Sequence, residues 1–355
     1  MQIFSLIMAG GGGTRFWPLS RQCAPKQLLN LSGNDIMINE TILRNKEIIP
    51  EANTYIITNS CQGDLMKKVL LDGVNHKNIL IEPEGKNTAA CIGYSTLVIN
   101  KRHGDSIVCI FPSDAYIGRE DEYLRDLKTA CEYVKTNDVI VTLGIKPSYP
   151  ATGYGYIKYN LDGDGSGIFH VEEFKEKPSI EKARTFIAEG RYLWNSGIII
   201  TRTNTLLKNM ERFLPKLYKQ LKGFEEFIDT ESEEEEAARM YSALQSLSVD
   251  FGILERSDEV MVIPSGFEWN DVGSWDTLGA IYPPDSDGNI IKAEHTGIDT
   301  KNSIIYGSKL VTTIGIDGLV IVNTDDALLI CPKSRAQEVK SIVELLKRQG
   351  KEQYI

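Results

Sequence analysis

Short apolar segments alternate with amphipathic segments along residues 1–145. Helical spacing of apolar residues covers Gln62–Leu71, Thr88–Lys101 and Glu120–Lys135. Strands that are apolar throughout and separated by helices are typical of βαβ units, whose parallel sheet is covered on both faces. The pattern therefore predicts an α/β fold with these apolar strands: Ile3–Met8, Thr54–Thr58, Ile79–Ile81, Ser106–Phe111 and Val139–Leu143.

Residues 150–282 are less regular, because strand-like and helical segments follow one another in mixed order. Helical spacing covers Ile180–Glu189 and Asn204–Leu221. Such an order indicates that the sheet continues with an antiparallel portion. The strand-like segments are Tyr154–Tyr159, Phe169–Phe174, Gly197–Thr201 and Val260–Ile263.

The final part of the chain changes character again, and we expect two domains, over residues 1–282 and 283–355. The second is small and β-rich and ends in a helix, Ser334–Arg348, with one apolar face. Its strand edges allow a homodimer. Gly or Asp turns separate its predicted strands, which are Ser303–Tyr306, Leu310–Ile316, Leu319–Asn323 and Ala327–Cys331.

Composition and charge exclude several classes of protein. Of 355 residues, 42% are hydrophobic and 25% charged, which are ordinary globular values and exclude collagenous, low-complexity and disordered chains. The net charge of -10 argues against a main role in binding nucleic acid or a membrane surface, since both need an excess of Lys and Arg. Eight of the acids lie within Glu225–Glu236, so much of this charge belongs to one predicted surface segment.

The N-terminal sequence and the positions of the cysteines and histidines favour a cytoplasmic protein without a zinc site. The N-terminus lacks the basic region of a signal peptide, and no apolar stretch approaches the ~18–20 residues of a membrane span. The six cysteines are at least 18 residues apart and form no CxxC pair, so we expect reduced thiols. The four histidines are equally scattered, which argues against local zinc-ligand spacing.

A glycine-rich loop carries the strongest chemical signal. Gly10–Gly13 directly follow the predicted strand Ile3–Met8, and glycines there let backbone N–H groups approach a phosphate. Neither the Walker nor the dinucleotide pattern fits. The first 34 residues contain Arg15, Arg21 and Lys26 and no acid, which produces a local positive field suited to a polyphosphate. The alternative is a tight turn followed by exposed bases.

A set of motifs then resembles one enzyme family. Gly-Gly-x-Gly-Thr-Arg-x-x-Pro-Leu-Ser from Gly10, followed by Pro25-Lys26, is similar to the signature of sugar-1-phosphate nucleotidylyltransferases. The whole set resembles the mannose-1-phosphate guanylyltransferases, from residue 1 to about residue 280. One departure is Ala115, where many relatives have His. The further motifs, in family order, are Glu82–Ala89, Phe111–Asp114, Thr152–Ile157, Phe174–Pro178, Trp194–Gly197 and Trp269–Trp275.

The resemblance implies both a fold and a reaction. The fold is α/β, with a Rossmann-like, mixed and mostly parallel sheet flanked by helices, and residues 1–282 form the catalytic domain. The reaction transfers GMP from GTP to mannose 1-phosphate, giving GDP-mannose and pyrophosphate, with Mg²⁺ as cofactor. The phosphate oxygen of the sugar attacks the α-phosphorus in line, so the protein needs cations, backbone donors and a metal but no nucleophile of its own.

The resemblance also implies site residues. Arg15, Lys26 and Lys177 are the catalytic cations, on the triphosphate, the α-phosphate and the sugar phosphate respectively, and Asp114 and Asp271 hold the metal. Glu82 is expected to accept from guanine, which presents N–H donors. The nucleotide-binding set is Ala9, Gly10, Gly11, Gly12, Gly13, Thr14, Arg15, Lys26, Glu82, Lys86, Asn87, Thr88, Ser113 and Asp114, and the sugar-phosphate set is Gly153, Gly155, Glu176, Lys177, Asn195 and Gly197.

Other interpretations remain open. Without the resemblance, a strand-end Asp is more often a turn former, Lys175–Lys177 a solvated strand edge, and Thr88 a helix N-cap. The same chemistry could serve another nucleotide or sugar, such as glucose 1-phosphate or heptose 1-phosphate. A non-catalytic nucleotide-sugar-binding regulatory subunit is a second alternative, which loss of Arg15 or a metal Asp would favour. A glycosyltransferase would show Asp-x-Asp after a strand, but Asp162–Asp164 fits a turn between two strands.

Overall fold

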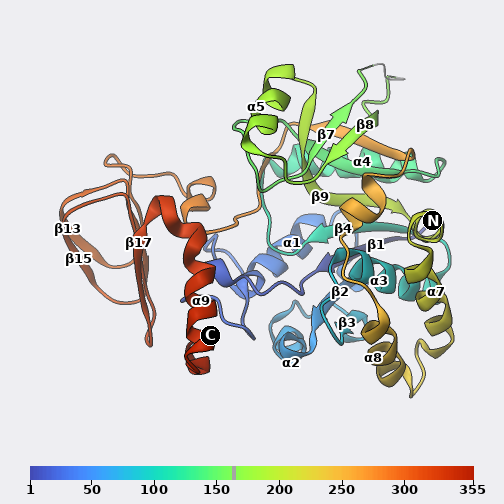
Figure 1. Ribbon diagram of the computed structural model, residues 1–355, viewed down its shortest axis with the longest axis horizontal. Coiled ribbons are helices and arrows are strands. Elements are labelled where there is room, and N and C mark those ends of the chain that lie inside the picture. The colour runs from blue at the N-terminus through green and yellow to red at the C-terminus, as the bar shows by residue number, and fades with distance from the viewer. Residues whose placement is uncertain (162–164) are drawn as a thin grey trace.

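A nine-stranded mixed sheet forms the centre of the large domain (Figure 1). The computed structural model describes residues 1–161 and 165–355, so the Asp162–Asp164 segment lies outside the described residues. The strand order is β3-β2-β1-β4-β9-β6-β10-β8-β7, and the predicted α/β class with an antiparallel portion is confirmed. The strands are β1 (Ile3–Met8), β2 (Thr54–Asn59), β3 (Ile79–Glu82), β4 (Ile107–Pro112), β6 (Ile140–Ile145), β7 (Tyr156–Tyr159), β8 (Phe169–Lys175), β9 (Tyr192–Arg202) and β10 (Val260–Ser265).

Helices cover both faces of this sheet, as apolar strands require. In β1, Phe4 and Leu6 pack into the core beside α3, α6, α7 and α8, whereas Ile7 packs into the core beside α1, α2, α4 and α5. The helix expected over Asn204–Leu221 is two helices, because Pro215 begins a new one. The helices are α1 (Met37–Asn45), α2 (Ser60–Val69), α3 (Thr88–His103), α4 (Glu120–Val134), α5 (Ile180–Glu189), α6 (Thr203–Phe213), α7 (Pro215–Phe224) and α8 (Glu233–Ala243). None of the helices in residues 1–161 and 165–355 is long and apolar enough to cross a membrane.

The order of the first strands fixes where a ligand can bind. The chain runs from β1 through β2 to β3 on one side, and β4 then pairs with the other side of β1. The loops leaving β1 and β4 therefore separate at the carboxyl edge of the sheet, where open α/β sheets bind their ligands. A two-stranded ribbon of β5 (Tyr116–Gly118) and β11 (Glu268–Asn270) lies just before the segment that contains Asp271.

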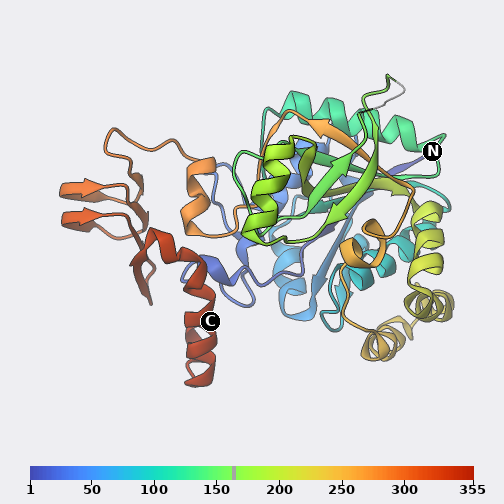
Figure 2. The same cartoon turned by 45° about the horizontal axis from the view of Figure 1, so that its top comes forward.

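The C-terminal domain is a β-helix, which the sequence pattern identifies only as β-rich. Its parallel strands stack Ile290, Ile304 and Val320 in register, and all three side chains are buried. Its strands are β12 (Ile290–Lys292), β13 (His295–Lys301), β14 (Ile304–Gly307), β15 (Val311–Asp317), β16 (Leu319–Asn323) and the antiparallel β17 (Leu328–Pro332), followed by α9 (Val339–Arg348). In both ribbon views β13 and β15 lie far from the large sheet (Figure 1 and Figure 2).

A third apolar core joins this domain to the glycine loop. It contains Phe16 and Trp17, which follow the loop, together with Val272 and Trp275 and with Val320 of the β-helix. The Trp17 indole donates to the carbonyl of Tyr354 at 2.7 Å, and the Trp275 indole donates to that of Trp17 at 3.1 Å. The C-terminal domain therefore supports the backbone on both sides of the carboxyl edge of the sheet.

One expectation about the cysteines is wrong. Cys23 and Cys61 form a disulfide, with Cα atoms 5.4 Å apart, although the sequence spacing suggested reduced thiols. The two residues are 38 positions apart, and the return of β2 brings α2 beside the loop that follows β1. Spacing along the chain could not indicate this proximity. The remaining cysteines are free: Cys91, Cys109, Cys131 and Cys331.

Candidate active site

The glycine loop is packed tightly against Lys26. Gly13 has φ +54°, and a Cβ atom there would lie 2.5 Å from the backbone nitrogen of Lys26, so only glycine fits. The Ser20 hydroxyl donates to the Gly13 carbonyl at 2.7 Å. Below the loop, the Gln27 amide donates to the carbonyls of Ala9 at 2.6 Å and Gly11 at 3.2 Å. These contacts hold the loop open towards the carboxyl edge of the sheet.

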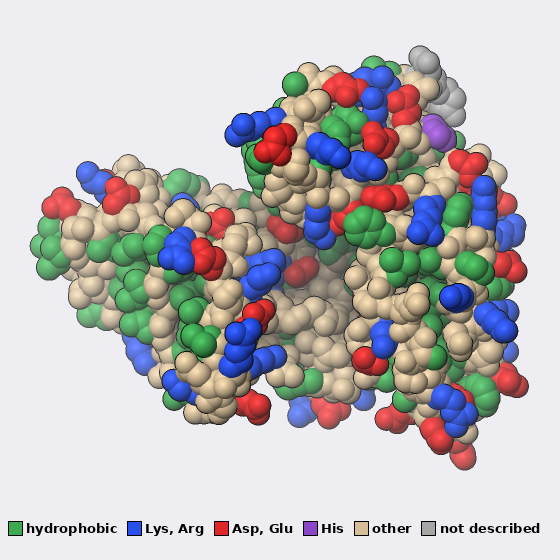
Figure 3. Space-filling model, viewed as in Figure 1, with side chains coloured by type: hydrophobic (Ala, Val, Ile, Leu, Met, Phe, Trp, Pro, Cys, Tyr) green, Lys and Arg blue, Asp and Glu red, His purple; other side chains and the backbone are tan. Residues whose placement is uncertain are grey.

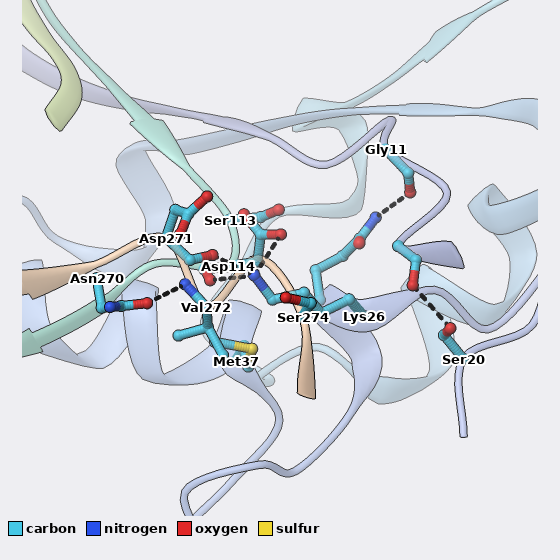
Figure 4. Close-up of polar contacts among 12 residues, drawn as sticks. Gly11, Ser20, Lys26, Met37, Ser113, Asp114, Asn270, Asp271, Val272 and Ser274 are labelled. Atoms are coloured by element: carbon cyan, nitrogen blue, oxygen red, sulfur yellow. Dashed lines mark hydrogen bonds and ion pairs between the residues drawn. The ribbon is translucent and has the colours of Figure 1, made fainter. Parts of the chain in front are cut away.

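Lys26 connects the two segments that carry the predicted metal ligands (Figure 4). Lys26 is only 3% exposed. The ammonium donates to the backbone carbonyls of Asp114 at 2.8 Å and Asp271 at 2.6 Å, and it lies 2.9 Å from Asp114 Oδ2. One cation thus fixes the end of β4 and the turn after β11 in one place, which brings the two aspartates to the same site.

The Asp271 turn is held in an unusual backbone conformation. Val272 has φ +45°, which is rare for a β-branched residue and occurs where the surroundings enforce it. Its side chain is fully buried in the core shared with the C-terminal domain, and its N–H donates to Asn270 Oδ1 at 2.7 Å. On the other side, the Tyr154 hydroxyl donates to Asp271 Oδ1 at 2.9 Å.

Two cavities meet at the aspartates. The first, of about 260 Å³, is lined by the loop residues Gly13, Thr14 and Arg15 and by Lys26. The second, of about 200 Å³, lies across the sheet edge towards β7 and β9. Asp114 and Asp271 line both. Figure 3 shows the molecule hollowed between its lobes, with acidic side chains inside the hollow. Two ligands bound in these cavities would meet beside the two carboxylates.

The second cavity contains most of the predicted sugar-phosphate set. Its lining includes Gly153, Gly155, Glu176, Asn195 and Gly197. Gly155 leaves room for a neighbour, because a Cβ atom there would lie 2.6 Å from Glu176 Oε2. The absence of a side chain at Gly155 therefore admits the Glu176 carboxylate to the cavity wall. Trp269 also lines the cavity and packs edge-on against Tyr154.

Asp250 is a cavity residue that the motifs did not reveal. It lies at the start of a π-helical segment, Asp250–Leu254, and lines the second cavity together with Glu176. Asn195 Nδ2 donates to Asp250 Oδ1 at 3.1 Å, while Asn195 Oδ1 accepts from the Thr142 hydroxyl at 3.1 Å. Burial, and secondarily the Glu176 charge, raises the pKa of Asp250 to about 6. The short sequence around Asp250 carries no signal for this position.

Several predicted residues lie outside both cavities. Lys177 has a side chain that is 63% exposed and pairs with Glu176 at 2.8 Å, and Lys86 pairs with Glu84 at 3.0 Å. Ala9 has its N–H bonded to Ile57 and its carbonyl to Gln27. Their roles, and those of Asn87 and Ser113, stay predictions. Thr88 lines the second cavity.

The start of α3 corrects the alternative role given to Thr88. The helix N-cap is Asn87, whose side chain accepts from the Thr88 N–H at 2.8 Å. Asn87 has φ +67° and ψ 179°, a backbone region that residues other than glycine rarely adopt and that the surroundings must enforce. The Thr88 hydroxyl instead accepts from the Val249 N–H at 2.9 Å. It therefore ties the segment before Asp250 to the first turn of α3.

Glu82 lies under the glycine loop. It is 7% exposed, accepts from the Tyr241 hydroxyl at 3.3 Å, and would lie 3.3 Å from a Cβ atom on Gly10. Burial raises its pKa to about 7. The folded protein therefore binds more protons than the unfolded chain between about pH 4.5 and 7, so this group lowers stability progressively as the pH rises through that window.

We accordingly expect Glu82→Gln to stabilise the protein at pH 8 by up to about 3 kcal/mol, with a much smaller gain at pH 5. Denaturant unfolding at the two pH values measures this difference. The exposed Glu234→Gln in α8 is the matched control and should change stability little at either pH. An equal effect of Glu82→Gln at pH 5 and pH 8 would contradict the assignment of a raised pKa.

A glycine loop at the switch point of an open α/β sheet indicates a nucleotide-binding protein, and the comparisons with known proteins identify its class as a transferase. The family model described as nucleotidyl transferase matches residues 4–285, and the one described as MannoseP isomerase/GMP-like beta-helix domain matches residues 285–346. The chain therefore belongs to the nucleotidyl transferase family, and within it to the mannose-1-phosphate guanylyltransferases.

Three of the similar proteins show how far the match extends. The chain is 35% identical to mannose-1-phosphate guanylyltransferase 2 of Escherichia coli O157:H7, over 99% of this chain and 75% of the relative. It is 34% identical to the xanthan biosynthesis protein XanB of Xanthomonas campestris, over 98% of this chain and 74% of the relative. A crystal structure named mannose-1-phosphate geranyltransferase, from Thermus thermophilus, superposes with a TM-score of 0.89 at 30% identity, covering 98% and 100% of the two chains.

Proposed function

We propose that this enzyme transfers GMP from GTP to mannose 1-phosphate, yielding GDP-mannose and pyrophosphate. The observation that carries the proposal is the pair of cavities that share Asp114 and Asp271 as lining residues. A triphosphate on the glycine loop and a sugar phosphate in the second cavity would bring their reacting groups to this junction. The choice of guanine and mannose is supported by the names of the relatives.

The proposed chemistry is a direct displacement. An oxygen of the sugar phosphate attacks the α-phosphorus, the bond to the bridging oxygen of the β-phosphate breaks, and pyrophosphate leaves with that electron pair. Both reactants are anions, so the rate depends on positioning and on fixed positive charge. Arg15 is exposed at the loop cavity and would stabilise the leaving pyrophosphate. Lys26 holds both aspartate segments, with its ammonium at the same cavity, beside the expected α-phosphate.

A magnesium ion fits the donor set of the junction. Within residues 1–161 and 165–355, no group of three or more His, Cys, Asp or Glu side chains is arranged as a metal site. Two carboxylates beside a phosphate cavity are nevertheless what Mg²⁺ uses, because substrate phosphates and water complete its coordination. Asp114 and Asp271 would hold the ion. When bound, it would neutralise phosphate charge and align the reacting phosphates.

Recognition of the sugar would rest on the carboxylates of the second cavity. Glu176 and Asp250 both line it, and a hexose presents several hydroxyl donors. Asn195 already accepts from Thr142 and the Gly197 N–H and donates to Asp250. Its main effect is therefore to orient Asp250, which leaves the carboxylates as acceptors for sugar hydroxyls.

Asp250→Asn should raise the KM for mannose 1-phosphate by about 10- to 100-fold, because a charged acceptor is lost, and leave the KM for GTP unchanged. Steady-state kinetics with each substrate varied in turn measures both constants. Asp258→Asn, an exposed aspartate paired with Arg212, is the control. Equal KM values for mannose 1-phosphate in wild type and Asp250→Asn would contradict the sugar role.

The position of bond cleavage gives a direct test of the reaction. With GTP labelled at the α-phosphorus, the label should appear in GDP-mannose, and with label at the γ-phosphorus it should appear in pyrophosphate. Transfer of the γ-label to the sugar would contradict nucleotidyl transfer. A larger rate with glucose 1-phosphate or heptose 1-phosphate would favour the alternative sugar. Specific binding of GDP-mannose without any turnover would favour a regulatory subunit.

We also propose that two copies pair through the C-terminal domain. Ile298 on β13 and Ile314 on β15 lie side by side and are 61% and 75% exposed. The edge strand β17 also exposes two apolar side chains, Leu328 and Ile330. Exposed apolar side chains beside an open strand edge favour association. Sedimentation should show a dimer for the wild type and a monomer for Ile314→Lys. A monomeric wild type would contradict the pairing.

A further inference from the structure

The Cys23–Cys61 disulfide lies beside the loop that would bind the triphosphate. Cys23 belongs to a tight turn in which Arg21 and Ala24 exchange backbone hydrogen bonds, at 2.9 and 3.1 Å, and the short helical turn that begins at Lys26 follows directly. Cys61 lies in the first turn of α2. Both cysteines are exposed, so a small thiol in solution can reach the bond.

The residues next to these cysteines form the underside of the glycine loop. Gln62, which follows Cys61, donates to the carbonyls of Gly11 and Gln22, each at 3.4 Å. Gln62 also accepts from Gln27 at 3.2 Å, and Gln27 directly follows Lys26. Gln27 in turn donates to Gly11 at 3.2 Å. The disulfide therefore connects covalently the two segments that these amides connect by longer, weaker bonds.

The geometry indicates what loss of the disulfide would change. The hydrogen bonds from Gln62 to the loop are long for N–H···O contacts and between neutral groups, so each contributes little. Without the covalent bond, the Arg21–Ala24 turn can move away from α2. The position of Gly11 and of the Lys26 segment would then be less restricted, and the triphosphate would have to order both on binding.

The other cysteines differ in accessibility. Cys91, Cys109 and Cys131 are buried. Burial raises the pKa of the Cys91 and Cys109 thiols, which disfavours the reactive thiolate. Cys109 and Cys131 share a thiol hydrogen bond, with sulfur atoms 3.5 Å apart, and form no disulfide. Cys331 is partly exposed but has no disulfide partner, and burial raises the pKa of its thiol as well. Mild reduction of the folded protein would therefore act on the Cys23–Cys61 bond.

We propose that the Cys23–Cys61 pair is a redox modification site that sets the affinity of the glycine loop for a nucleoside triphosphate; this rests on the proposed function. A thiolate of an external dithiol attacks one sulfur, the disulfide breaks, and the second thiol of the reagent resolves the mixed disulfide. Two electrons and two protons pass to the cysteine pair, and the dithiol becomes a disulfide. The predicted cytoplasmic location suits this role, because the few disulfides of cytoplasmic proteins are usually transient and are catalytic or redox-sensing.

The test compares oxidised and reduced enzyme. The full chain is equilibrated with mixtures of reduced and oxidised dithiothreitol, the thiols are counted by alkylation and mass spectrometry, and the KM values for GTP and mannose 1-phosphate are measured. Reduction should raise the KM for GTP by at least about five-fold and leave that for mannose 1-phosphate unchanged. Cys23→Ser should reproduce the reduced enzyme and not respond to the mixtures. Cys331→Ser should respond like the wild type.

An equal KM for GTP in the oxidised and reduced enzyme would overturn the proposal. A Cys23→Ser variant whose KM for GTP still changes with the dithiothreitol mixture as in the wild type would overturn it too. Should Cys23→Ser fail to fold, reduced wild type with both thiols alkylated supplies the same comparison. An oxidised wild type that does not turn over GTP with mannose 1-phosphate refutes the proposed function instead. In that event calorimetric titration with GTP decides the redox proposal, which predicts at least about five-fold tighter binding to the oxidised form.

Discussion

Asp271→Asn is expected to lower kcat by about 10²- to 10³-fold in a protein that remains folded. The amide keeps an oxygen that can accept from Tyr154, which lies 2.9 Å from Asp271 Oδ1, so the turn itself is preserved. What the substitution removes is a negative charge at the junction of the two cavities, and with it a ligand for a hard cation. Asp114→Asn should have a similar effect, because the same two cavities share both side chains.

The measurement is kcat at saturating substrates, with circular dichroism and thermal melting to show that the variants are folded. Asp325→Asn, an exposed aspartate in the C-terminal domain, is the matched control and should turn over at the wild-type rate. Raising the Mg²⁺ concentration should restore part of the rate of each active-site variant, because a weakened site fills at higher metal concentration. Near-normal turnover of a folded Asp271→Asn would exclude its metal role.

Lys26→Met should abolish turnover, with a loss of at least about 10³-fold, and should also destabilise the fold by about 2–3 kcal/mol. Lys26 differs from the aspartates in being buried and in holding the backbone at two distant positions, with carbonyl contacts at 2.8 and 2.6 Å. Methionine retains the length of the stem but leaves both carbonyls and Asp114 without their donor. The loss therefore acts on the geometry of the site as well as on its charge.

Denaturant unfolding and kcat together measure this double effect. The exposed Lys340→Met in α9 is the control and should change neither quantity. Lys26→Arg keeps the charge but cannot place it within the same contacts, so it should recover stability more than turnover. If Lys26→Met keeps wild-type stability and its turnover stays within a few-fold of normal, Lys26 does not hold the Asp114 and Asp271 segments together.

The fold could be predicted from the sequence wherever the signal is local. The apolar runs that become β1 and β4 predict buried parallel strands, and among the glycines after β1 the position of Gly13 admits no other residue. The C-terminal domain was predicted only as β-rich. Its parallel stacking joins residues such as Ile290 and Ile304, which lie on separate strands, and short strands alone do not reveal which neighbours they pair with.

The site was predictable where a motif carried it and not where the tertiary structure assembles it. Asp114 and Asp271 belong to sequence motifs that can be recognised. Their proximity, however, depends on the Lys26 side chain, which donates to the backbone carbonyls of both residues. Asp250 enters the cavity through a π-helical segment and a bond from Asn195, and neither is visible in the sequence. The Cys23–Cys61 bond is a third case, because it depends on α2 packing beside the glycine loop.

The measurement that tests the central claim most directly is pyrophosphate release with each of five nucleotides, GTP, ATP, UTP, CTP and dTTP, crossed with several sugar 1-phosphates, with and without Mg²⁺. The two cavities that meet at Asp114 and Asp271, and the family to which the chain belongs, predict release that depends on both substrates and on the metal. It should be fastest with GTP and mannose 1-phosphate. Release without a sugar phosphate, or a clear preference for a base other than guanine, would contradict the account.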